Sequence, residues 1–355
     1  VQGVVEKKNT LPILSNVLLN LKGNKLEIVA TDLDIVFYDE ITELKVVEEG
    51  NTTTSANVLF DILRKIPPGT EISFTLKSEN KLSLKSKNSD FNLLCLPSSN
   101  FPTFDDKFEG EKIEIDKKRF LSLLNKTKIS ISNDDTRHYL NGIYLHATES
   151  NKNTFLTGVA TDSHRLSSCS ILVENIKSFA SIIIPRKTVF QLCSLLDNID
   201  EKLIIQASAS KIKFSLGKIN LISKVIDGKF PDYQKVVPKE NTKTLTVVSS
   251  DFISSIERGA SVSIDRKEGV KLELSRDKLK LSVNSTNSGD GNEVVSAKYD
   301  GEELTIGFNS KYLIDIASEI EDKNLTFSLK NSTSPVLVFD NLDKNSFYVI
   351  MPMKI

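Results

Sequence analysis

Ala160-Thr161-Asp162 repeats an earlier stretch of this chain, Ala30-Thr31-Asp32, at an offset of 130 residues. A second marker behaves in the same way, because Phe101-Pro102 returns as Phe230-Pro231 after 129 residues. Two independent markers with nearly the same period indicate that the chain is built from copies of one structural unit.

Between these markers lies a segment with apolar residues at helical spacing, residues 57–63, and residues 187–193 match it. A third version occurs at residues 310–316. Stretches with apolar residues two apart surround these helices, as expected for strands with one dry and one wet face. They are residues 25–29, 81–85, 211–215 and 278–282.

Each copy is therefore predicted to run strand, helix, hairpin strands, second helix and further hairpin strands. This order predicts an α+β fold with the helices on one face of antiparallel sheets. A chain of 355 residues is too long for one core, and we expect three domains at residues 1–111, 112–241 and 242–355. About 15 residues of the second copy have no counterpart in the first, so the first copy is expected to lack its first strand and most of its first helix.

Three similar units in a row predict a curved array whose sheets join at their edges and whose helices share one surface. Head-to-tail contact closes such an array into a ring when the rotation is right, and closure covers the free sheet edges. Two chains of three domains would give a ring with sixfold pseudo-symmetry.

The expected helices carry basic residues. Residues 117–128 place Phe120, Leu123 and Leu124 on one face and leave five cations elsewhere. Further cations lie on or beside the other helices: Arg64, Lys65, Arg186, Lys187, Arg258 and Lys311. Such residues attract phosphates without sequence preference. Ordinary solvated helix faces are the alternative interpretation.

Composition excludes several classes of protein. The formal net charge of −1 excludes a uniformly basic nucleic-acid binder, although it permits separate basic and acidic faces. No apolar run approaches the roughly 18 residues of a membrane span. The N-terminal residues Val1 to Glu6 lack the features of a signal peptide, so we expect a cytoplasmic protein. Three widely spaced cysteines, Cys95, Cys169 and Cys193, are expected to be buried reduced thiols.

Catalytic constellations are absent from the sequence. Ser163 and His164 are adjacent, so their side chains diverge and a triad would need distant partners. The histidines lack metal-ligand spacing, and no Gly-rich phosphate loop occurs, so we expect no metal and no cofactor. Asp32 and Asp162 occupy equivalent repeat positions, which favours a turn or capping role over a catalytic pair.

From residue 10 to the end, the sequence resembles the bacterial DNA polymerase III β subunit family, the β sliding clamps. The motifs that carry this resemblance are Tyr139-Leu140-Asn141-Gly142, residues 159–166, Ile184-Pro185-Arg186-Lys187, residues 227–233 and residues 348–355.

The resemblance implies a non-enzymatic accessory subunit of the polymerase holoenzyme. It implies a homodimeric ring that encircles double-stranded DNA without sequence preference and is placed there by a clamp loader. Replicative and translesion polymerases, ligase and repair proteins would bind it through short peptide motifs. No membrane partner is implied.

One apolar pocket per subunit would receive these peptides. By resemblance its residues are Leu140, Thr161, His164, Arg165, Leu166, Pro231, Val236, Asn309, Tyr312, Thr333, Val349, Met351, Pro352 and Met353. Ser163 stands where the family commonly has Gly. Adaptable Met side chains and rigid Pro walls suit a site with many ligands. A last strand that simply ends in the core is the alternative interpretation of Met351-Pro352-Met353.

The resemblance also implies two further surfaces. Its DNA contacts would be Lys8, Arg137, His138, Tyr139, Arg186 and Lys187. Its dimer interface would join Phe91 to Ser261 and Val262.

A repeat-built adhesive or protein-interaction protein is the second hypothesis, and a secretion signal or binding independent of DNA topology would favour it. An enzyme ranks third and would need a titratable pair converging in a closed pocket.

Overall fold

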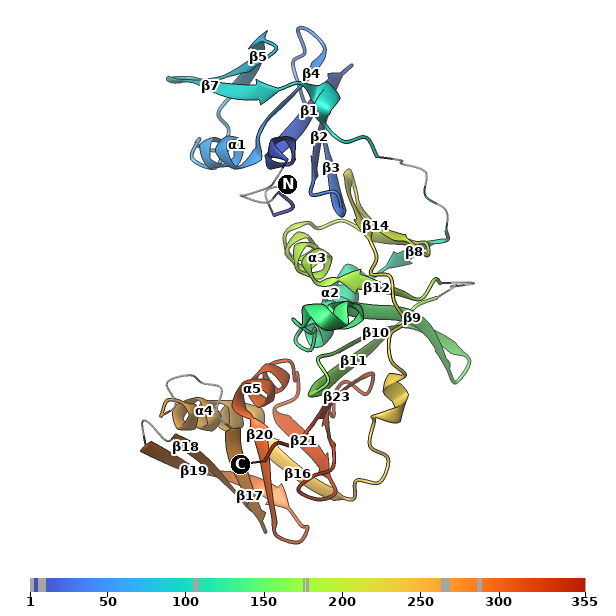
Figure 1. Cartoon of the computed structure of the whole chain (residues 1–355), viewed down its shortest axis with the longest axis vertical. Helices are drawn as coiled ribbons and strands as arrows, with labels where there is room; N and C mark the ends of the chain where they lie inside the picture. The colour runs from blue at the N-terminus through green and yellow to red at the C-terminus, as the bar shows by residue number, and fades with distance from the viewer. Residues whose placement is uncertain are drawn as a thin grey trace. The chain divides into compact units, whose positions relative to one another are not determined.

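The computed structural model describes residues 3–5, 11–104, 108, 110–174, 176, 179–262, 269–285 and 289–354 (Figure 1). The chain forms two compact units. The first unit holds Val1–Lys117 and Phe190–Val225, and the second unit holds Lys118–Val189 and Ile226–Ile355. Each unit is built around one antiparallel sheet.

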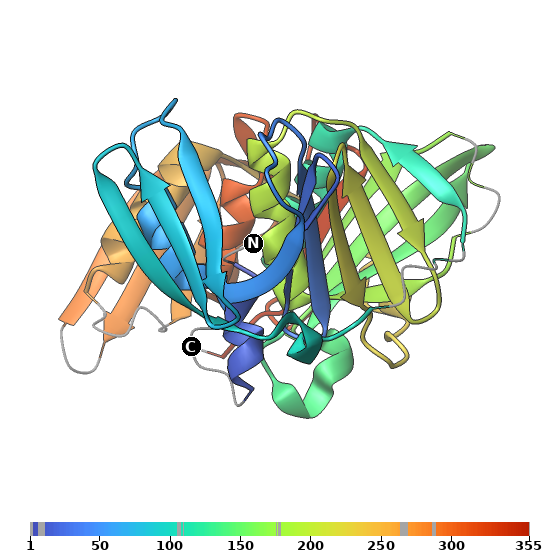
Figure 2. The same cartoon turned by 90° about the horizontal axis from the view of Figure 1, so that it is seen from above.

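The described residues of the first unit form an 11-stranded sheet, whose hairpin strands can be followed in Figure 2. In spatial order its strands are β5 (Ile72–Ser78), β6 (Lys81–Ser86), β7 (Ser89–Leu96), β4 (Gly50–Ser55), β1 (Asn16–Lys22), β2 (Lys25–Thr31), β3 (Ile35–Ile41), β15 (Ile219–Lys224), β14 (Lys211–Leu216), β13 (Leu203–Ala207) and β8 (Lys112–Ile115).

The described residues of the second unit form a 12-stranded sheet. Its strands in spatial order are β12 (Ile182–Pro185), β9 (Gly142–Ser150), β10 (Asn153–Thr161), β11 (Arg165–Leu172), β23 (Ser346–Ile350), β22 (Val336–Asp340), β21 (Asn324–Leu329), β16 (Lys243–Val248), β19 (Gly289–Tyr299), β18 (Lys278–Ser285), β17 (Gly269–Ser275) and β20 (Leu304–Asn309).

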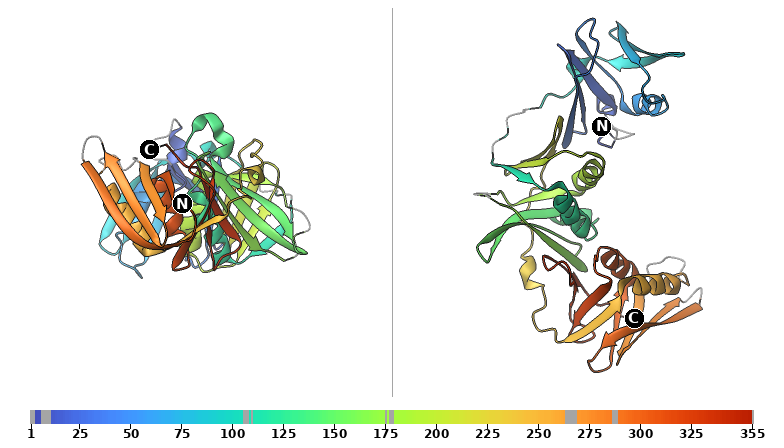
Figure 3. Two further views of the ribbon diagram at one scale, coloured as in Figure 1. Left: turned by 90° about the horizontal axis from the view of Figure 1, so that it is seen from below. Right: turned by 180° about the vertical axis from the view of Figure 1, so that it is seen from behind.

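Helices lie against these sheets. They are α1 (Ala56–Leu63), α2 (Lys117–Lys128), α3 (Arg186–Asn198), α4 (Ser249–Ala260) and α5 (Ser310–Ser318). In the second unit α4 and α5 lie beside each other, as both Figure 1 and the right part of Figure 3 show. The buried residues of α4 recur at helical spacing from Phe252 to Ala260, which turns one stripe of the helix toward the sheet. The predicted α+β class is confirmed.

The repeated motif folds into the same turn in both copies. Thr31 Oγ1 accepts the N–H of Leu33 at 2.9 Å, and Thr161 Oγ1 accepts the N–H of Ser163 at 3.1 Å. Asp32 and Asp162 each accept two further backbone N–H groups of the turn. These contacts confirm the capping role expected of both aspartates.

The sheets continue from one expected domain into the next. Strand β3 pairs with β15, and β11 pairs with β23. Joining at sheet edges is what the repeat predicted. Because the pairing crosses the expected boundaries, the compact units divide residues 112–241 between them. The boundaries near residues 111 and 242 therefore stay predictions.

Helix α2 buries the apolar face that its sequence predicts, and Phe120, Leu123 and Leu124 are fully inaccessible to solvent. One expectation about this helix is wrong. Lys126 does not belong to its solvated side, because only 4% of its surface is exposed and two carboxylates receive its ammonium group.

An aromatic stack underlies the segment that leads out of β15. Tyr144 lies between His146 and Phe230, with ring centroids 4.5 and 4.9 Å away. The Tyr233 hydroxyl is 3.3 Å from His146 Nε2. Burial lowers the pKa of His146 below its ordinary value, because the charged imidazolium loses water there.

The packing of α2 on β10 makes a prediction about Gly158. A Cβ added there would lie 2.6 Å from Cδ2 of the buried Leu123. We expect Gly158→Ala to lower the free energy of unfolding in urea by about 1–3 kcal/mol through overpacking. Gly259→Ala is the matched control, since its Cβ meets Val283 only at 3.4 Å and alanine favours a helix. Equal stability of the two variants would contradict this packing.

The aromatic stack predicts a pH dependence. The unfolded chain binds a proton at His146 more readily than the folded chain, so the stability is complete above a pH of about 6.5 and is lost as the pH falls below it. We expect the thermal midpoint to fall less between pH 7.5 and 5.5 in His146→Phe than in the unmodified protein. Identical pH slopes would show that His146 makes no such contribution.

Candidate functional site

A cavity of about 210 Å³ lies within the second unit. Its lining comes from the stretch around the repeated turn, from the segment after Phe230 and from the last strand. The lining residues are Leu140, Thr161, Ser163, Arg165, Leu166, Pro231, Asp232, Tyr233, Val236, Val349 and Met351.

The base of this cavity is apolar and rigid. Leu140 ends the 3-10 helix η3 (Asp135–Leu140), and Leu166 and Val349 pair across β11 and β23. All three are at most 3% exposed and belong to one hydrophobic cluster. Strand pairing therefore builds the base from residues far apart in the sequence.

The mouth of the cavity is apolar and open to solvent. Val236 follows the short 3-10 helix η4 (Tyr233–Lys235) and is 50% exposed, and Met351 is 39% exposed. Large apolar side chains that rim a cavity in this way are typical of a surface that binds an apolar ligand.

Arg165 holds one wall in place. Its Nε is 3.1 Å from Asp162 Oδ2, and its Nη1 is 2.8 Å from Asp315 Oδ2. The guanidinium also lies 4.2 Å from the ring centroid of Tyr312. Because Asp315 and Tyr312 are on α5, Arg165 fastens that helix to β11.

The structure gathers eight of the expected pocket residues around the cavity: Leu140, Thr161, Arg165, Leu166, Pro231, Val236, Val349 and Met351. The other six lie outside its lining. They are His164, Asn309, Tyr312, Thr333, Pro352 and Met353.

Some of these six support the lining. The backbone carbonyl of His164 accepts the N–H of Met351 at 2.8 Å. Asn309 caps α5, and Tyr312 packs on Arg165. Thr333 lies in an exposed turn, where its N–H donates to Asn331.

Three lining residues were missed by the sequence analysis: Ser163, Asp232 and Tyr233. Each lies within a motif that carried the family resemblance, and adjacency in those motifs is the signal that could have found them. Ser163 has a φ of 77°, a conformation that favours glycine. Its Oγ accepts a hydrogen bond from Arg137 Nη1 at 2.5 Å, so the turn is tied to η3.

The expected DNA contacts are placed on two segments. Arg137, His138 and Tyr139 lie on η3, and His138 Nε2 is 3.1 Å from the carbonyl of Asp227. Arg186 and Lys187 are the first two residues of α3. Lys8 lies outside the described residues.

Several helix cations are already paired with nearby carboxylates. Arg64 bonds to Asp61 at 3.1 Å, and Arg258 bonds to Glu293 at 2.8 Å. Lys311 is 3.0 Å from Asp315. Local pairing leaves a weaker positive field than the sequence alone indicates.

The expected interface residues lie in different units. Phe91 is on β7 of the first unit and is 37% exposed. Ser261 and Val262 follow α4 in the second unit, and Val262 packs against its core. The neighbouring carboxylate of Asp90 pairs with Lys85, whose ammonium group lowers the pKa of Asp90.

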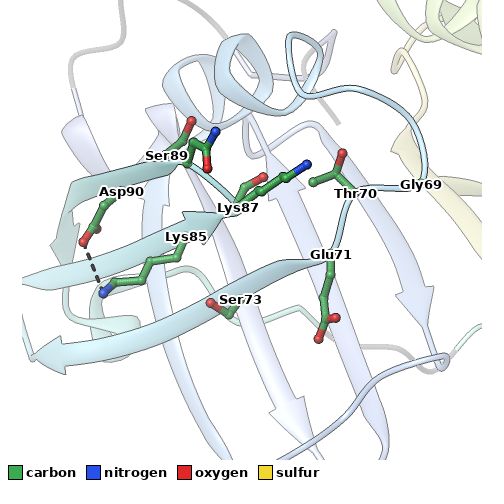
Figure 4. Close-up of a pocket in the computed structure, with 10 residues that line it drawn as sticks. Gly69, Thr70, Glu71, Ser73, Lys85, Lys87, Ser89 and Asp90 are labelled. Atoms are coloured by element: carbon green, nitrogen blue, oxygen red, sulfur yellow. Dashed lines mark ion pairs between the residues drawn. The ribbon is translucent and has the colours of Figure 1, made fainter.

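A second hollow, of about 830 Å³, lies beside β5, β6 and β7 (Figure 4). Figure 4 shows Lys85 and Asp90 facing each other across neighbouring strands. Its walls are polar and mostly solvated, and they include Glu71, Lys87 and Ser89. Such a hollow lacks the buried convergent groups of a ligand site.

In the described part of the chain, no group of three or more His, Cys, Asp or Glu side chains could hold a metal ion. Every helix in those ranges is too short or too polar to span a bilayer. None of the three cysteines is in a disulfide and all three are buried, as expected, and burial raises the pKa of Cys169 to about 12.

Family comparisons cover nearly the whole chain. The N-terminal, central and C-terminal domains of the DNA polymerase III β subunit match residues 1–105, 114–232 and 234–354. The β sliding clamp of Caulobacter vibrioides is 37% identical over 358 residues, and that of Escherichia coli K12 is 34% identical over 355. Both alignments cover 100% of this chain and 96% of the relative.

Solved structures agree with these relatives. A Caulobacter crescentus β sliding clamp crystallised with polyethylene glycol superposes with a TM-score of 0.96 at 37% identity. A Bartonella birtlesii sliding clamp bound to griselimycin superposes with a TM-score of 0.95 at 38% identity. Each comparison covers 100% of this chain and 95% of the other. The chain therefore belongs to the DNA polymerase III β subunit family, and it is a DNA sliding clamp, an accessory processivity factor that is not itself a catalyst.

Proposed function

We propose that this clamp closes head to tail with a second copy around double-stranded DNA and holds its partners through short peptides. The partners are replicative and translesion polymerases, ligase and repair proteins, and a clamp loader places the ring on DNA. The observation that carries this proposal is the apolar cavity at the junction of β11 and β23, with Val236 and Met351 exposed at its mouth.

The chemistry of the cavity favours peptides with bulky apolar side chains. Leu140, Leu166 and Val349 give a dry base, and Met351 can adapt to ligands of different shape. Sliding clamps of Bartonella birtlesii and Pseudomonas aeruginosa bind griselimycin. Griselimycin is therefore a suitable probe, and we propose that it occupies this cavity.

Sheet edges that join within the chain support a ring, since β3 pairs with β15 and β11 pairs with β23. Between subunits, Phe91 on β7 of one copy would contact Ser261 and Val262, which follow α4 of the next copy. Paired edges are also protected from aggregation.

Sequence-independent contact with DNA would come from many weak phosphate interactions. Arg137, Arg186 and Lys187 are the described basic residues we propose for it, with His138 and Tyr139 beside them. Because each phosphate contact is diffuse, no single substitution is expected to abolish function.

Encirclement is tested by loading the protein onto nicked circular DNA with a matching clamp loader and ATP. We expect retention on the circle and loss once the circle is cut, because a closed ring slides off a free end. Added salt is the control, since electrostatic binding weakens steeply with salt. Equal retention on circular and linear DNA, lost together in salt, would overturn the ring mechanism.

The cavity is tested by titrating griselimycin into matched methionine variants. Met351 lines the cavity, whereas Met353 is similarly exposed and lies outside the lining. We expect Met351→Ala to raise the dissociation constant about tenfold, as for loss of an apolar anchor, and Met353→Ala to change it less than twofold. Equal effects of both variants would place the ligand elsewhere.

A further inference from the structure

Two lysine or arginine side chains are buried in the described part of the chain. They are Arg165, with 8% of its surface exposed, and Lys126, with 4%. Arg165 lies at the end of the β11 and β23 pairing that borders the cavity, where it is opposite Ile350. At the other end of this pairing Cys169 is opposite Ser346. Lys126 contacts Asp343, in the turn that leads into that end of β23.

The ammonium group of Lys126 joins three segments of the second unit. It projects from the last turn of α2 and lies 2.7 Å from Glu321 Oε1, in the connection between α5 and β21. It also lies 2.7 Å from Asp343 Oδ2, in the turn between β22 and β23. One side chain of the second repeat copy therefore holds two loops of the third.

The charge of Lys126 is stable in this position. Burial alone would lower its pKa, but hydrogen bonds to Asp343 and Glu321 outweigh burial and raise the pKa well above its ordinary value. Lys126 is buried, whereas the side chains of Asp343 and Glu321 are 21% and 62% exposed. Such a pair adds little net stability, but removal of Lys126 leaves the partly buried carboxylate of Asp343 uncompensated. The cluster is therefore better explained as a contact that positions these segments than as a source of stability.

Asp343 transmits the contact to the last strand. Its Oδ1 accepts the N–H of Asn345 at 3.0 Å, and its Oδ2 accepts the hydroxyl of Ser346 at 2.6 Å. Ser346 is the first residue of β23 and pairs with Cys169. Asp343 thus links Lys126 to the first residue of β23.

The far end of the same short strand builds the cavity. Val349 lies three residues after Ser346 and forms part of the base, and Met351 follows the strand at the mouth. A five-residue strand paired on both sides moves as one body, so displacement of its start also displaces Val349.

We propose that Lys126 is a positioning residue of the ligand cavity. Through Asp343 it sets the placement of β23 against β11, while Arg165 at the other end of the pairing fastens α5 to β11. This inference rests on the proposed function of the cavity.

Two variants separate positioning from stability. Lys126→Met leaves Asp343 and Glu321 without their partner, and a triple variant adds Glu321→Gln and Asp343→Asn to remove all three charges. We expect the single variant to lower the thermal midpoint and to weaken griselimycin binding about fivefold. We expect the triple variant to regain the thermal midpoint and still bind about fivefold more weakly, because the link to β23 is lost.

A second measurement does not depend on a ligand. Ser150 and Ser332 are exposed and lie in the second and third repeat copies, so cysteines placed there accept spin labels. The native thiols are buried and react slowly. We expect a broader distance distribution between the labels in the triple variant than in the unmodified sequence.

The control is Lys202→Met, which breaks the exposed ion pair with Glu114 and should change neither binding nor distances. Binding by the triple variant within twofold of the unmodified protein would overturn the inference. Failure of the unmodified protein to bind griselimycin would refute the proposed cavity ligand instead. In that case the distances between the spin labels test the positioning role of Lys126. A distance distribution in the triple variant that equals that of the unmodified sequence would overturn this role.

Discussion

The backbone pairing of β11 with β23 is the interaction on which the second unit depends. It makes one continuous sheet from two repeat copies and sets Leu166 opposite Val349, which gives the cavity its base. The segments that meet there are distant in sequence, so neither copy could form the site alone. Buried ionic contacts at both ends of the pairing, made by Arg165 and Lys126, tie helices to this joint.

Much of the fold was predictable because each repeat copy carries the same short sequence motifs. The turn at Asp32 and Asp162 needs the same hydrogen bonds in each copy, so its sequence returns with the period of the structure. The apolar face of α2 was predictable for a similar reason, since helical spacing alone determines which residues face the sheet. The cavity was different, because its residues were found through resemblance to a family and not through any pattern.

Contacts between segments that are distant in the chain have no comparable pattern in the sequence. Lys126 has the sequence context of a solvated helix cation, and its partner Asp343 is 217 residues away. The lining role of Tyr233 and the stack around His146 also depend on tertiary packing that periodicity does not encode. Ion pairing also explains why the basic residues of the helices overestimate the positive charge of the surface, since Arg258 and Lys311 each pair with a nearby carboxylate.

The distance in sequence between β11 and β23 has a consequence during synthesis. A ribosome that adds about 5–20 residues per second needs roughly 10–35 seconds after β11 emerges before β23 follows. During that interval one edge of β11 has no partner, and a free edge can recruit other chains. Ser167, Ser168 and Ser170 lie within this strand, and all three belong to its pairing with β10 or β23. Polar side chains at these positions lower the hydrophobicity of β11 while its edge is unpaired, and so protect the nascent chain from aggregation.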